Sequence, residues 1–360
     1  MSSFTKSQSE AIRHVDGPLL VLAGPGSGKT TVVTKRVQYL VQDCSISPSS
    51  ILVITFTKAA ATEMKERFTR LMEQQAQPPG GYGNVSFGTF HAVFFNILKL
   101  SYGFTVANII TEETRRQYLK ESVDRMKLEI DDENEFLTGI AGEISLIKNE
   151  RVELEHYFSK NCSEEVFRKI YEGYEERKKR ARLIDFDDML VYTWELLSQR
   201  KDILSAWQKK YQYILVDEFQ DINRLQYDIL RLLAEPENNL FIVGDDDQSI
   251  YRFRGARPEI MLNFRKDYPQ SGQVLLNDNF RSTTQIVEAA GRVIARNKTR
   301  FPKNIIARGG DGALVRSLKF PDQQQRDSEL AGKGRFASPD SGHLSHQHPA
   351  KGRDPEADGV

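Results

Sequence analysis

The clearest chemical feature of the chain is a glycine-rich loop, AGPGSGKTT, at residues 23–31. Its glycines let successive backbone N–H groups turn inward around phosphate oxygens, and a helix that follows adds the positive end of its dipole. Lys29 then reaches the β and γ phosphates, and the hydroxyl of Thr30 can ligate Mg²⁺. Ala23 stands where the strict pattern has its first glycine. The predicted nucleotide contacts in this loop are Gly24, Gly26, Ser27, Gly28, Lys29, Thr30 and Thr31.

A pair of adjacent acids is the second chemical feature. The apolar run at 213–216 ends in Asp217 and Glu218. In ATPases with this arrangement the first acid holds Mg²⁺ and the second polarises the attacking water. Taken alone, the pattern is equally typical of a strand that ends in a solvated acidic turn. Together with the loop it predicts the site of a P-loop NTPase that uses Mg²⁺, with Thr30 and Asp217 as the metal ligands and Glu218 as a catalytic residue.

These two features need elements that bring them to one place. Short apolar, β-branched runs, each followed by turn residues and a helical pattern, predict buried parallel strands. Such strands alternating with amphipathic helices indicate an α/β fold with a doubly wound parallel sheet, whose ligands bind at the carboxyl ends of the strands. The loop and the acid pair both follow such runs. The predicted strands lie at 18–23, 51–56, 213–216 and 240–243.

Composition divides the rest of the chain. Between 94 and 210 the strand signal vanishes, and helices such as 112–127 and 164–182 are expected. A further strand and helix begin at 273, and after 322 the chain is rich in Gly, Pro, Ser, His, Gln and charged residues, a composition that favours disorder. The predicted domains are a first sheet domain at 1–93 and 211–272, an inserted helical domain at 94–210, the start of a second sheet domain at 273–321, and a disordered tail at 322–360.

Charge and cysteine content narrow the class of protein. Fifty Lys plus Arg residues balance fifty Asp plus Glu residues, so nucleic acid has to be bound by local patches rather than by an overall positive field. The two cysteines, Cys44 and Cys162, form no CxxC pattern, which indicates a reducing compartment without a disulfide framework or zinc site. No apolar run approaches the roughly 20 residues of a membrane span. We expect a cytoplasmic monomer without membrane contact.

Longer motifs are similar to a known family. Residues 217–221, DEFQD, resemble motif II of the UvrD/Rep/PcrA-type helicases of superfamily one, and residues 243–256, VGDDDQSIYRFRGA, resemble their motif III almost residue for residue. The resemblance covers about residues 4 to 320 and implies a RecA-like P-loop NTPase with an inserted all-α domain and an incomplete second RecA-like domain. Further family-like motifs lie at 5–8, 54–64, 88–91, 185–188 and 279–282.

The resemblance implies roles for three further residues at the ATP site. Gln8 would bond both edges of the adenine and favour ATP over GTP. Gln248 would sense the γ-phosphate and couple it to the DNA groove. Arg281 would enter the site from the second domain as an arginine finger, which can raise the rate by a factor of about 10³ to 10⁵ because it stabilises charge on the transferring phosphoryl group.

The resemblance also implies a groove for single-stranded DNA and for single-strand/double-strand junctions. Bases stack on aromatic faces there, each stack contributing roughly 1 to 3 kcal/mol. Phe253 replaces the tryptophan usual in the family, and its smaller ring weakens that stack. For each aromatic residue taken singly, core packing is the alternative. The implied groove residues are Phe56, Thr57, His91, Tyr251, Phe253 and Arg254.

Two charged patterns carry weaker expectations. The run RKKRAR at 177–182 is either a basic patch that touches duplex DNA or a solvated helix face. His343, His346 and His348 have a metal-like spacing, but they lie in the tail whose composition favours disorder.

The function implied is an ATP-dependent DNA helicase that translocates 3′ to 5′ on single-stranded DNA, with proteins of DNA repair or replication as partners. Because motifs V and VI are not visible, we expect ATP and DNA binding, very slow hydrolysis and no unwinding by this chain alone. The alternatives are a regulatory module or gene remnant that binds ATP and DNA without turnover, and a P-loop ATPase unrelated to nucleic acid. DNA stimulation of ATP turnover distinguishes these functions.

Overall fold

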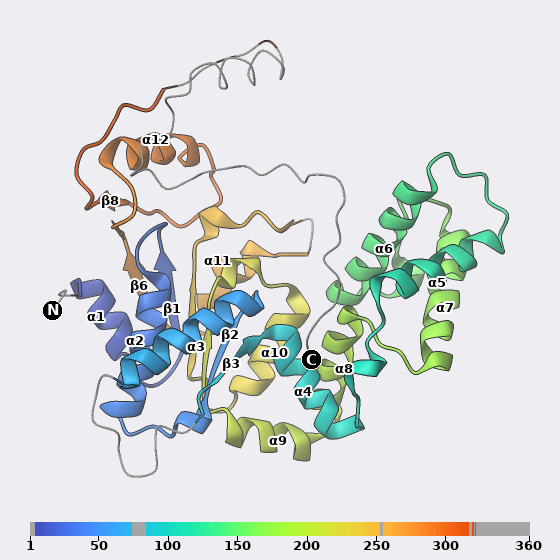
Figure 1. Ribbon diagram of the computed structural model, residues 1–360, viewed down its shortest axis with the longest axis horizontal. Coiled ribbons are helices and arrows are strands. Elements are labelled where there is room, and N and C mark those ends of the chain that lie inside the picture. Colours follow the sequence, from blue (N-terminus) through green and yellow to red (C-terminus); the bar gives the residue numbers. More distant parts are fainter. Residues whose placement is uncertain (1–3, 74–83, 253–254, 317–318, 320, 322–360) are drawn as a thin grey trace. The chain divides into compact units, whose positions relative to one another are not determined.

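The computed structural model describes residues 4–73, 84–252, 255–316, 319 and 321 (Figure 1). The chain divides into two units, Met1–Ala313 and Leu314–Val360. All helices and strands named below belong to the first unit. The expected disordered tail at 322–360, with its three histidines, lies outside the described residues.

A parallel sheet of six strands forms the centre of this unit (Figure 1). Its strands follow the order β3-β2-β4-β5-β1-β6. Four of them, β1, β2, β4 and β5, are buried along their whole length, which confirms the α/β fold predicted from the apolar runs. The strands are β1 (Leu19–Ala23), β2 (Ile51–Thr55), β3 (Ser86–Thr89), β4 (Tyr213–Val216), β5 (Leu240–Gly244) and β6 (Gly272–Leu276).

Two strands differ from the expectation. The sequence of β3, SFGT, has no apolar run and is only half-buried at the sheet edge, so its pattern gave no strand signal. The strand β6, expected to open a second sheet domain at 273, instead pairs with β1, from Leu19 beside Gly272 to Ala23 beside Leu276. A strand pattern specifies burial but does not specify the neighbour, and here the chain passes from β5 across β1 to the edge of the sheet.

Helices cover both faces of the sheet because alternate residues of each strand point to opposite sides. Leu20, Leu22 and Ile54 belong to one hydrophobic cluster, whereas Leu19 and Val21 belong to the other. The first cluster includes residues of α4 (Phe90–Tyr102), α8 (Phe186–Gln199), α9 (Lys201–Lys210), α10 (Arg224–Ala234) and α11 (Pro258–Asp267). The second includes residues of α1 (Lys6–Arg13), α2 (Lys29–Gln42) and α3 (Lys58–Glu73).

The inserted helices α5 (Glu112–Asp124), α6 (Glu133–Glu150) and α7 (Glu164–Ala181) have a hydrophobic cluster of their own. The helices α4, α8 and α9, which composition had grouped with them, pack in the sheet cluster instead. A bridge between Ile109 and Ile184 pairs the residues on either side of the segment that holds these three helices. We therefore propose 109 and 184 as the boundaries of the helical domain.

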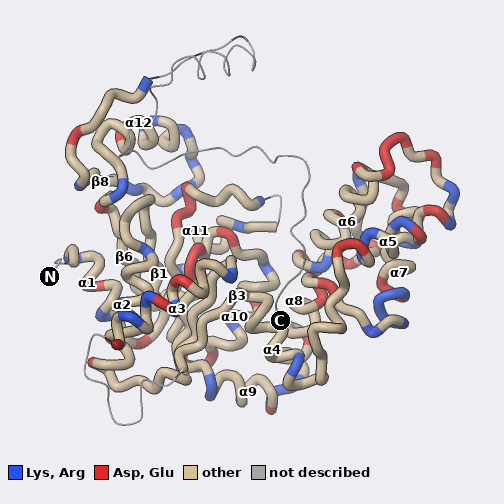
Figure 2. Tube along the Cα trace, viewed as in Figure 1, with Lys and Arg blue, Asp and Glu red and all other residues tan. Residues whose placement is uncertain are grey.

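Charges of both signs are interspersed along α5, α6 and α7 (Figure 2). Within the basic run at 177–182, Lys178 is buried and Arg177 pairs with Glu121. Only Lys179, Arg180 and Arg182 among its charged residues are exposed, and Arg180 pairs with Glu176. The run is therefore not a continuous basic surface.

The chain after β6 forms a small α/β segment. The short strands β7 (Asp278–Asn279) and β8 (Ile306–Ala307) pair in parallel, and α12 (Thr284–Ile294) connects them. Among the described residues, the remaining elements are short 3₁₀ turns, at Pro48–Ser50, Val106–Asn108, Leu154–His156, Phe219–Asp221 and Asp246–Gln248.

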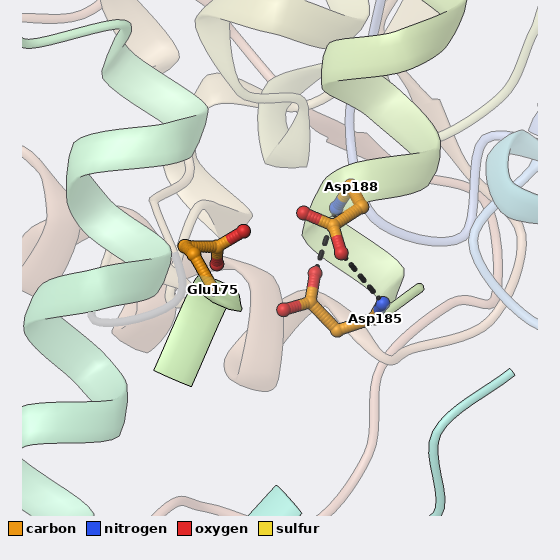
Figure 3. Close-up of side chains that lie close together, drawn as sticks. All are labelled: Glu175, Asp185 and Asp188. Atoms are coloured by element: carbon orange, nitrogen blue, oxygen red, sulfur yellow. Dashed lines mark hydrogen bonds between the residues drawn. The ribbon is translucent and has the colours of Figure 1, made fainter. Parts of the chain in front are cut away.

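A buried ion cluster joins the helical domain to the sheet layer. Glu175, Asp185 and Asp188 lie together, and the two aspartates each accept a hydrogen bond from the other's backbone N–H (Figure 3). The ammonium groups of Lys148 and Lys178 lie within 3 Å of all three carboxylates. Burial would raise the pKa of Asp185, but the two lysines lower it well below its usual value. The lysines thus occupy the place that a cation would take, and the acids at 185–188 stabilise the domain junction.

Candidate active site

The strand order places three functional segments side by side. The glycine-rich loop follows β1, the acid pair follows β4, and β5 lies between these two strands. Because the strands are parallel, their carboxyl ends meet at one edge of the sheet. Gln248, which follows β5, is therefore held between the loop and the acid pair.

The loop has the backbone conformation of a phosphate-binding turn. Gly26 and Gly28 have φ values of +67° and +83°, in the left-handed region where other residues are strained. The helix α2 begins directly at Lys29, so its N-terminal N–H groups point into the loop.

The segment after β6 closes over this loop. The side chain of Asn279 donates to the carbonyl of Pro25 at 2.7 Å, and the backbone N–H of Phe280 donates to the carbonyl of Gly26 at 3.0 Å. A Cβ atom at Gly26 would lie 2.7 Å from the Cβ of Arg281. Glycine is thus needed at 26 for the close approach of the segment as well as for the turn.

A cavity of about 500 Å³ lies at this edge of the sheet. Among the residues predicted from sequence, it is lined by Gly26, Ser27, Gly28, Lys29, Thr30, Thr31, Glu218, Gln248 and Arg281. Gln8, Gly24 and Asp217 lie outside this lining. Gln8 is buried against the loop, where its side-chain amide donates to the carbonyl of Ser27 at 3.0 Å.

The cavity wall includes charged and aromatic residues that sequence reasoning missed. Arg67 pairs with Glu63 at 2.8 Å and donates to the hydroxyl of Thr31 at 3.3 Å. Glu63 and Arg67 lie one turn apart on α3, so their spacing at i and i+4 was a usable signal. Phe280 also lines the cavity and is 53% exposed, which leaves its ring available to a ligand.

Glu218 is held by two side chains. Its carboxylate accepts hydrogen bonds from Lys29 at 3.0 Å and from the amide of Gln220 at 2.9 Å. Its backbone is left-handed, with φ of +52°, a conformation that is costly for a residue other than glycine and that clusters at functional sites. Gln220 is buried, and its side-chain oxygen Oε1 accepts a hydrogen bond from the backbone N–H of Asp245 at 2.9 Å. Gln220 therefore joins the acid pair to the turn that carries Gln248.

Asp217 lies behind Glu218 and is almost fully buried. Burial, with a further contribution from the charge of Glu218, raises the pKa of Asp217 to about 7. A buried carboxylate that is costly to ionise is well matched to a cation. Oxygen donors such as Asp217 and the hydroxyl of Thr30 are the ligands that Mg²⁺ prefers. The residues therefore fit a magnesium ion.

The raised pKa of Asp217 predicts a stability effect. Between about pH 4 and pH 7 the folded protein binds the extra proton, so the folded state loses stability as pH rises through this window. Asp217→Asn is therefore expected to raise the free energy of unfolding of the nucleotide-free protein at pH 8 by up to about 4 kcal/mol, and by roughly 2 kcal/mol less at pH 5. Denaturant titration at both pH values measures this difference.

The control is Asp202→Asn, because Asp202 is exposed and its pKa is lowered to about 2 by Arg200. It is expected to stabilise the protein at neither pH. Equal stability of wild type and Asp217→Asn at pH 8 would contradict the assignment of a raised pKa to Asp217.

The residues implied for the DNA groove lie at the carboxyl ends of β2, β3 and β5. Phe56 is half-buried and packs edge-on to Phe90, with ring centroids 5.3 Å apart, so it contributes to the core cluster as well. Thr57 is exposed. Tyr251, beyond β5, is 40% exposed. Phe253 and Arg254 lie outside the described residues.

His91 stands at the start of α4, and its pKa is lowered by burial. Its ring contacts Phe186 edge to face at a centroid distance of 5.3 Å. Phe186 is 58% exposed, and sequence reasoning did not single it out. A large aromatic residue between acids was the available signal in the sequence.

A phosphate loop after β1, an acid pair after β4 and a polar residue after the strand between them, in a parallel sheet covered on both faces, define a RecA-like P-loop domain. Residues 4–269 match the sequence profile of the UvrD/REP helicase N-terminal domain. The chain belongs to the UvrD/REP helicase family, which is a family of enzymes.

Relatives among well-described proteins carry helicase names. The chain is 39% identical to "Putative ATP-dependent DNA helicase YjcD" of Bacillus subtilis over 326 residues, which is 90% of this chain and 42% of that protein. It is 38% identical to "ATP-dependent DNA helicase PcrA" of Leuconostoc citreum, over 87% of this chain and 42% of that protein. It is 36% identical to PcrA of Bacillus subtilis, over 92% and 45%. The chain thus spans less than half the length of these relatives.

In the part of the chain that the structure describes, no helix combines the length and the apolar character needed to cross a bilayer.

Proposed function

We propose that this chain binds and hydrolyses ATP with Mg²⁺ and couples hydrolysis to 3′ to 5′ movement on single-stranded DNA, as the ATP-binding part of a DNA helicase. The observation that supports this most directly is the single cavity that brings Lys29, Glu218, Gln248 and Arg281 together from four separate segments. The names of the relatives support DNA as the substrate.

The roles of the residues follow from their positions. The backbone N–H groups of the loop and Lys29 bind the phosphates, while Thr30 and Asp217 would hold Mg²⁺, which neutralises phosphate charge when bound. Lys29 now pairs with Glu218 at 3.0 Å. A γ-phosphate competes for this ammonium group, and its binding releases the carboxylate of Glu218 to accept a proton from the attacking water.

Two further roles concern the nucleotide base and the transferring phosphate. Gln8 sits behind the loop and binds the adenine edge, and the exposed ring of Phe280 offers a face for the base to stack on. Arg281 supplies positive charge to the transferring phosphoryl group.

The short distance along the chain between Gln248 and Tyr251 supports a coupling of ATP hydrolysis to DNA binding. Gln248 lines the nucleotide cavity, and Tyr251, three residues later, is 40% exposed and would stack a base. A movement of this turn on ATP binding therefore changes both the phosphate contact and the DNA contact. Phe56, Thr57, His91 and Phe186 would extend the groove along the same edge of the sheet.

The test is the rate of ATP hydrolysis with and without a single-stranded oligonucleotide. DNA is expected to stimulate turnover. Tyr251→Ala is expected to raise the Kd for the oligonucleotide at least about fivefold, because a stacked base is worth roughly 1 to 3 kcal/mol, and to leave turnover without DNA unchanged. The oligonucleotide Kd is measured by fluorescence anisotropy.

The control for this variant is Tyr102→Ala, because Tyr102 is exposed at the far end of α4. It is expected to leave the oligonucleotide Kd unchanged. ATP and DNA binding without turnover would replace the proposal by a binding module. ATP hydrolysis at the same rate with and without the oligonucleotide would replace the proposal by an ATPase unrelated to nucleic acid.

A further inference from the structure

Three consecutive aspartates follow β5, and we refer to Asp245–Asp247 as the acidic turn. Asp245 and Asp246 have buried side chains, 0% and 2% exposed. Consecutive carboxylates repel one another, and buried charges are stable only when they are paired. The shape of the acidic turn therefore depends on the groups that neutralise it.

The neutralising groups come from residues 300–303, which we call the anchor segment. The ammonium group of Lys303 lies 2.5 Å from Asp245, 2.5 Å from Asp246 and 2.9 Å from Asp247, and its side chain is only 1% exposed. Arg300 binds Asp247 through two nitrogens, at 2.7 and 2.6 Å. The backbone N–H of Phe301 donates to Asp246 at 2.8 Å.

The acidic turn also holds Gln248, a residue of the ATP site. The second carboxylate oxygen of Asp245 accepts from the side-chain amide of Gln248 at 2.6 Å. The backbone N–H of Asp245 donates to Gln220, whose amide in turn binds Glu218. Lys303 therefore lies one contact away from Gln248, although it lines no part of the nucleotide cavity.

The anchor segment and Arg281 both belong to the small α/β segment that contains β7, α12 and β8. Asn279 and Phe280, next to Arg281, contact the phosphate loop, and the anchor segment contacts the acidic turn. The pairing of β7 with β8 joins the residues that contact the phosphate loop to the anchor segment. The positions of Arg281 and Gln248 are thus linked through charged contacts outside the cavity.

We propose that Lys303 is a positioning residue for Gln248. By fixing the carboxylates of Asp245 and Asp246, it sets the turn from which Gln248 reaches the phosphate cavity, and it ties that turn to the segment that carries Arg281. This inference rests on the proposed role of Gln248 in ATP hydrolysis. It assigns a contribution to catalysis to a residue that does not line the nucleotide cavity.

The test compares Lys303→Met with wild type by two measurements. The first is hydrogen exchange at the backbone amides of Asp245, Asp247 and Gln248 in the nucleotide-free protein, which we expect to become at least about tenfold faster. The second is DNA-stimulated ATP hydrolysis, for which kcat is expected to fall at least about tenfold while KM for ATP stays within about threefold, since binding contacts are untouched.

Arg308→Met is the matched control, because Arg308 lies on the same segment and pairs with Asp278 at 2.6 Å, away from the acidic turn. It should leave both measurements unchanged. Faster exchange across the whole sheet in Lys303→Met would show a general structural role and overturn the proposal. Exchange and kcat equal to wild type would overturn it as well.

A second variant separates positioning from charge balance and protects the test if Lys303→Met does not fold. The double variant Lys303→Met/Asp246→Asn removes one cation and one carboxylate together, so the net charge of the cluster is kept. We expect kcat to stay low, because Asp245 and Gln248 are still without their anchor. A kcat restored to the wild-type value would contradict the proposal. If the wild type shows no DNA-stimulated turnover, the proposed function fails, but the exchange measurement still decides whether Lys303 fixes the turn.

Discussion

Glu218→Gln is expected to reduce ATP turnover at least about 10³-fold while ATP still binds. Glutamine keeps the size of the side chain and its contact with Gln220, but it cannot take a proton from the attacking water. The variant also removes the ion pair with Lys29, which frees the ammonium group for the phosphates. Nucleotide affinity is therefore expected to be retained or increased. Phosphate release gives kcat, and a fluorescent ATP analogue gives Kd.

Asp221→Asn is the control for the loss of a carboxylate from this turn. Asp221 lies three residues after Glu218, and its pKa is raised to about 6 by burial and by the charge of Glu218. Asp221 does not line the cavity, so the ATP turnover of Asp221→Asn is expected to stay within about tenfold of wild type. Turnover by Glu218→Gln close to the wild-type rate would mean that another group accepts the proton.

Arg281→Ala is expected to produce the second largest loss, about 10³-fold or more in kcat, because an arginine finger stabilises charge only in the transition state. KM for ATP is expected to change much less. Arg281 lines the cavity from the segment that Asn279 and Phe280 attach to the phosphate loop. Arg281→Lys keeps the charge but loses the planar fork of donors, so an intermediate rate is expected. Single-turnover hydrolysis measures the chemical step directly.

The control for Arg281→Ala is Arg308→Ala, which removes an arginine from the same segment outside the cavity. Its single-turnover rate is expected to match wild type. A small effect of Arg281→Ala on the chemical step, together with an intact fold, would show that the charge is supplied elsewhere.

The local patterns of the sequence were sufficient for the phosphate loop and the acid pair. Glycines at 26 and 28 fix left-handed turns, Lys29 starts a helix, and the apolar run before Asp217 is a buried strand. Each of these depends only on neighbouring residues, because backbone conformation and burial on both faces of a strand are local properties of composition and period. The four apolar strands were predicted for the same reason.

The tertiary structure alone decided which elements pack together. The strand β6 has the pattern of any strand, and only its pairing with β1 places it in the first sheet. The helices α4, α8 and α9 have the same kind of pattern as α5, α6 and α7, but they cover the sheet and the others form a separate cluster. Amphipathic period predicts that one face is buried, but the surface that buries it is chosen by long-range contacts.

The contacts around the site show the same division. Gln248 and Arg281 could be named from motifs, but Lys303 could not, because its role comes from partners far away in sequence. Lys303 is nearly 60 residues from the acids that it neutralises. A lysine in sequence indicates only a positive charge. Its burial against three carboxylates, and hence its influence on the ATP site, arises when the segment after β6 folds back over the carboxyl edge of the sheet.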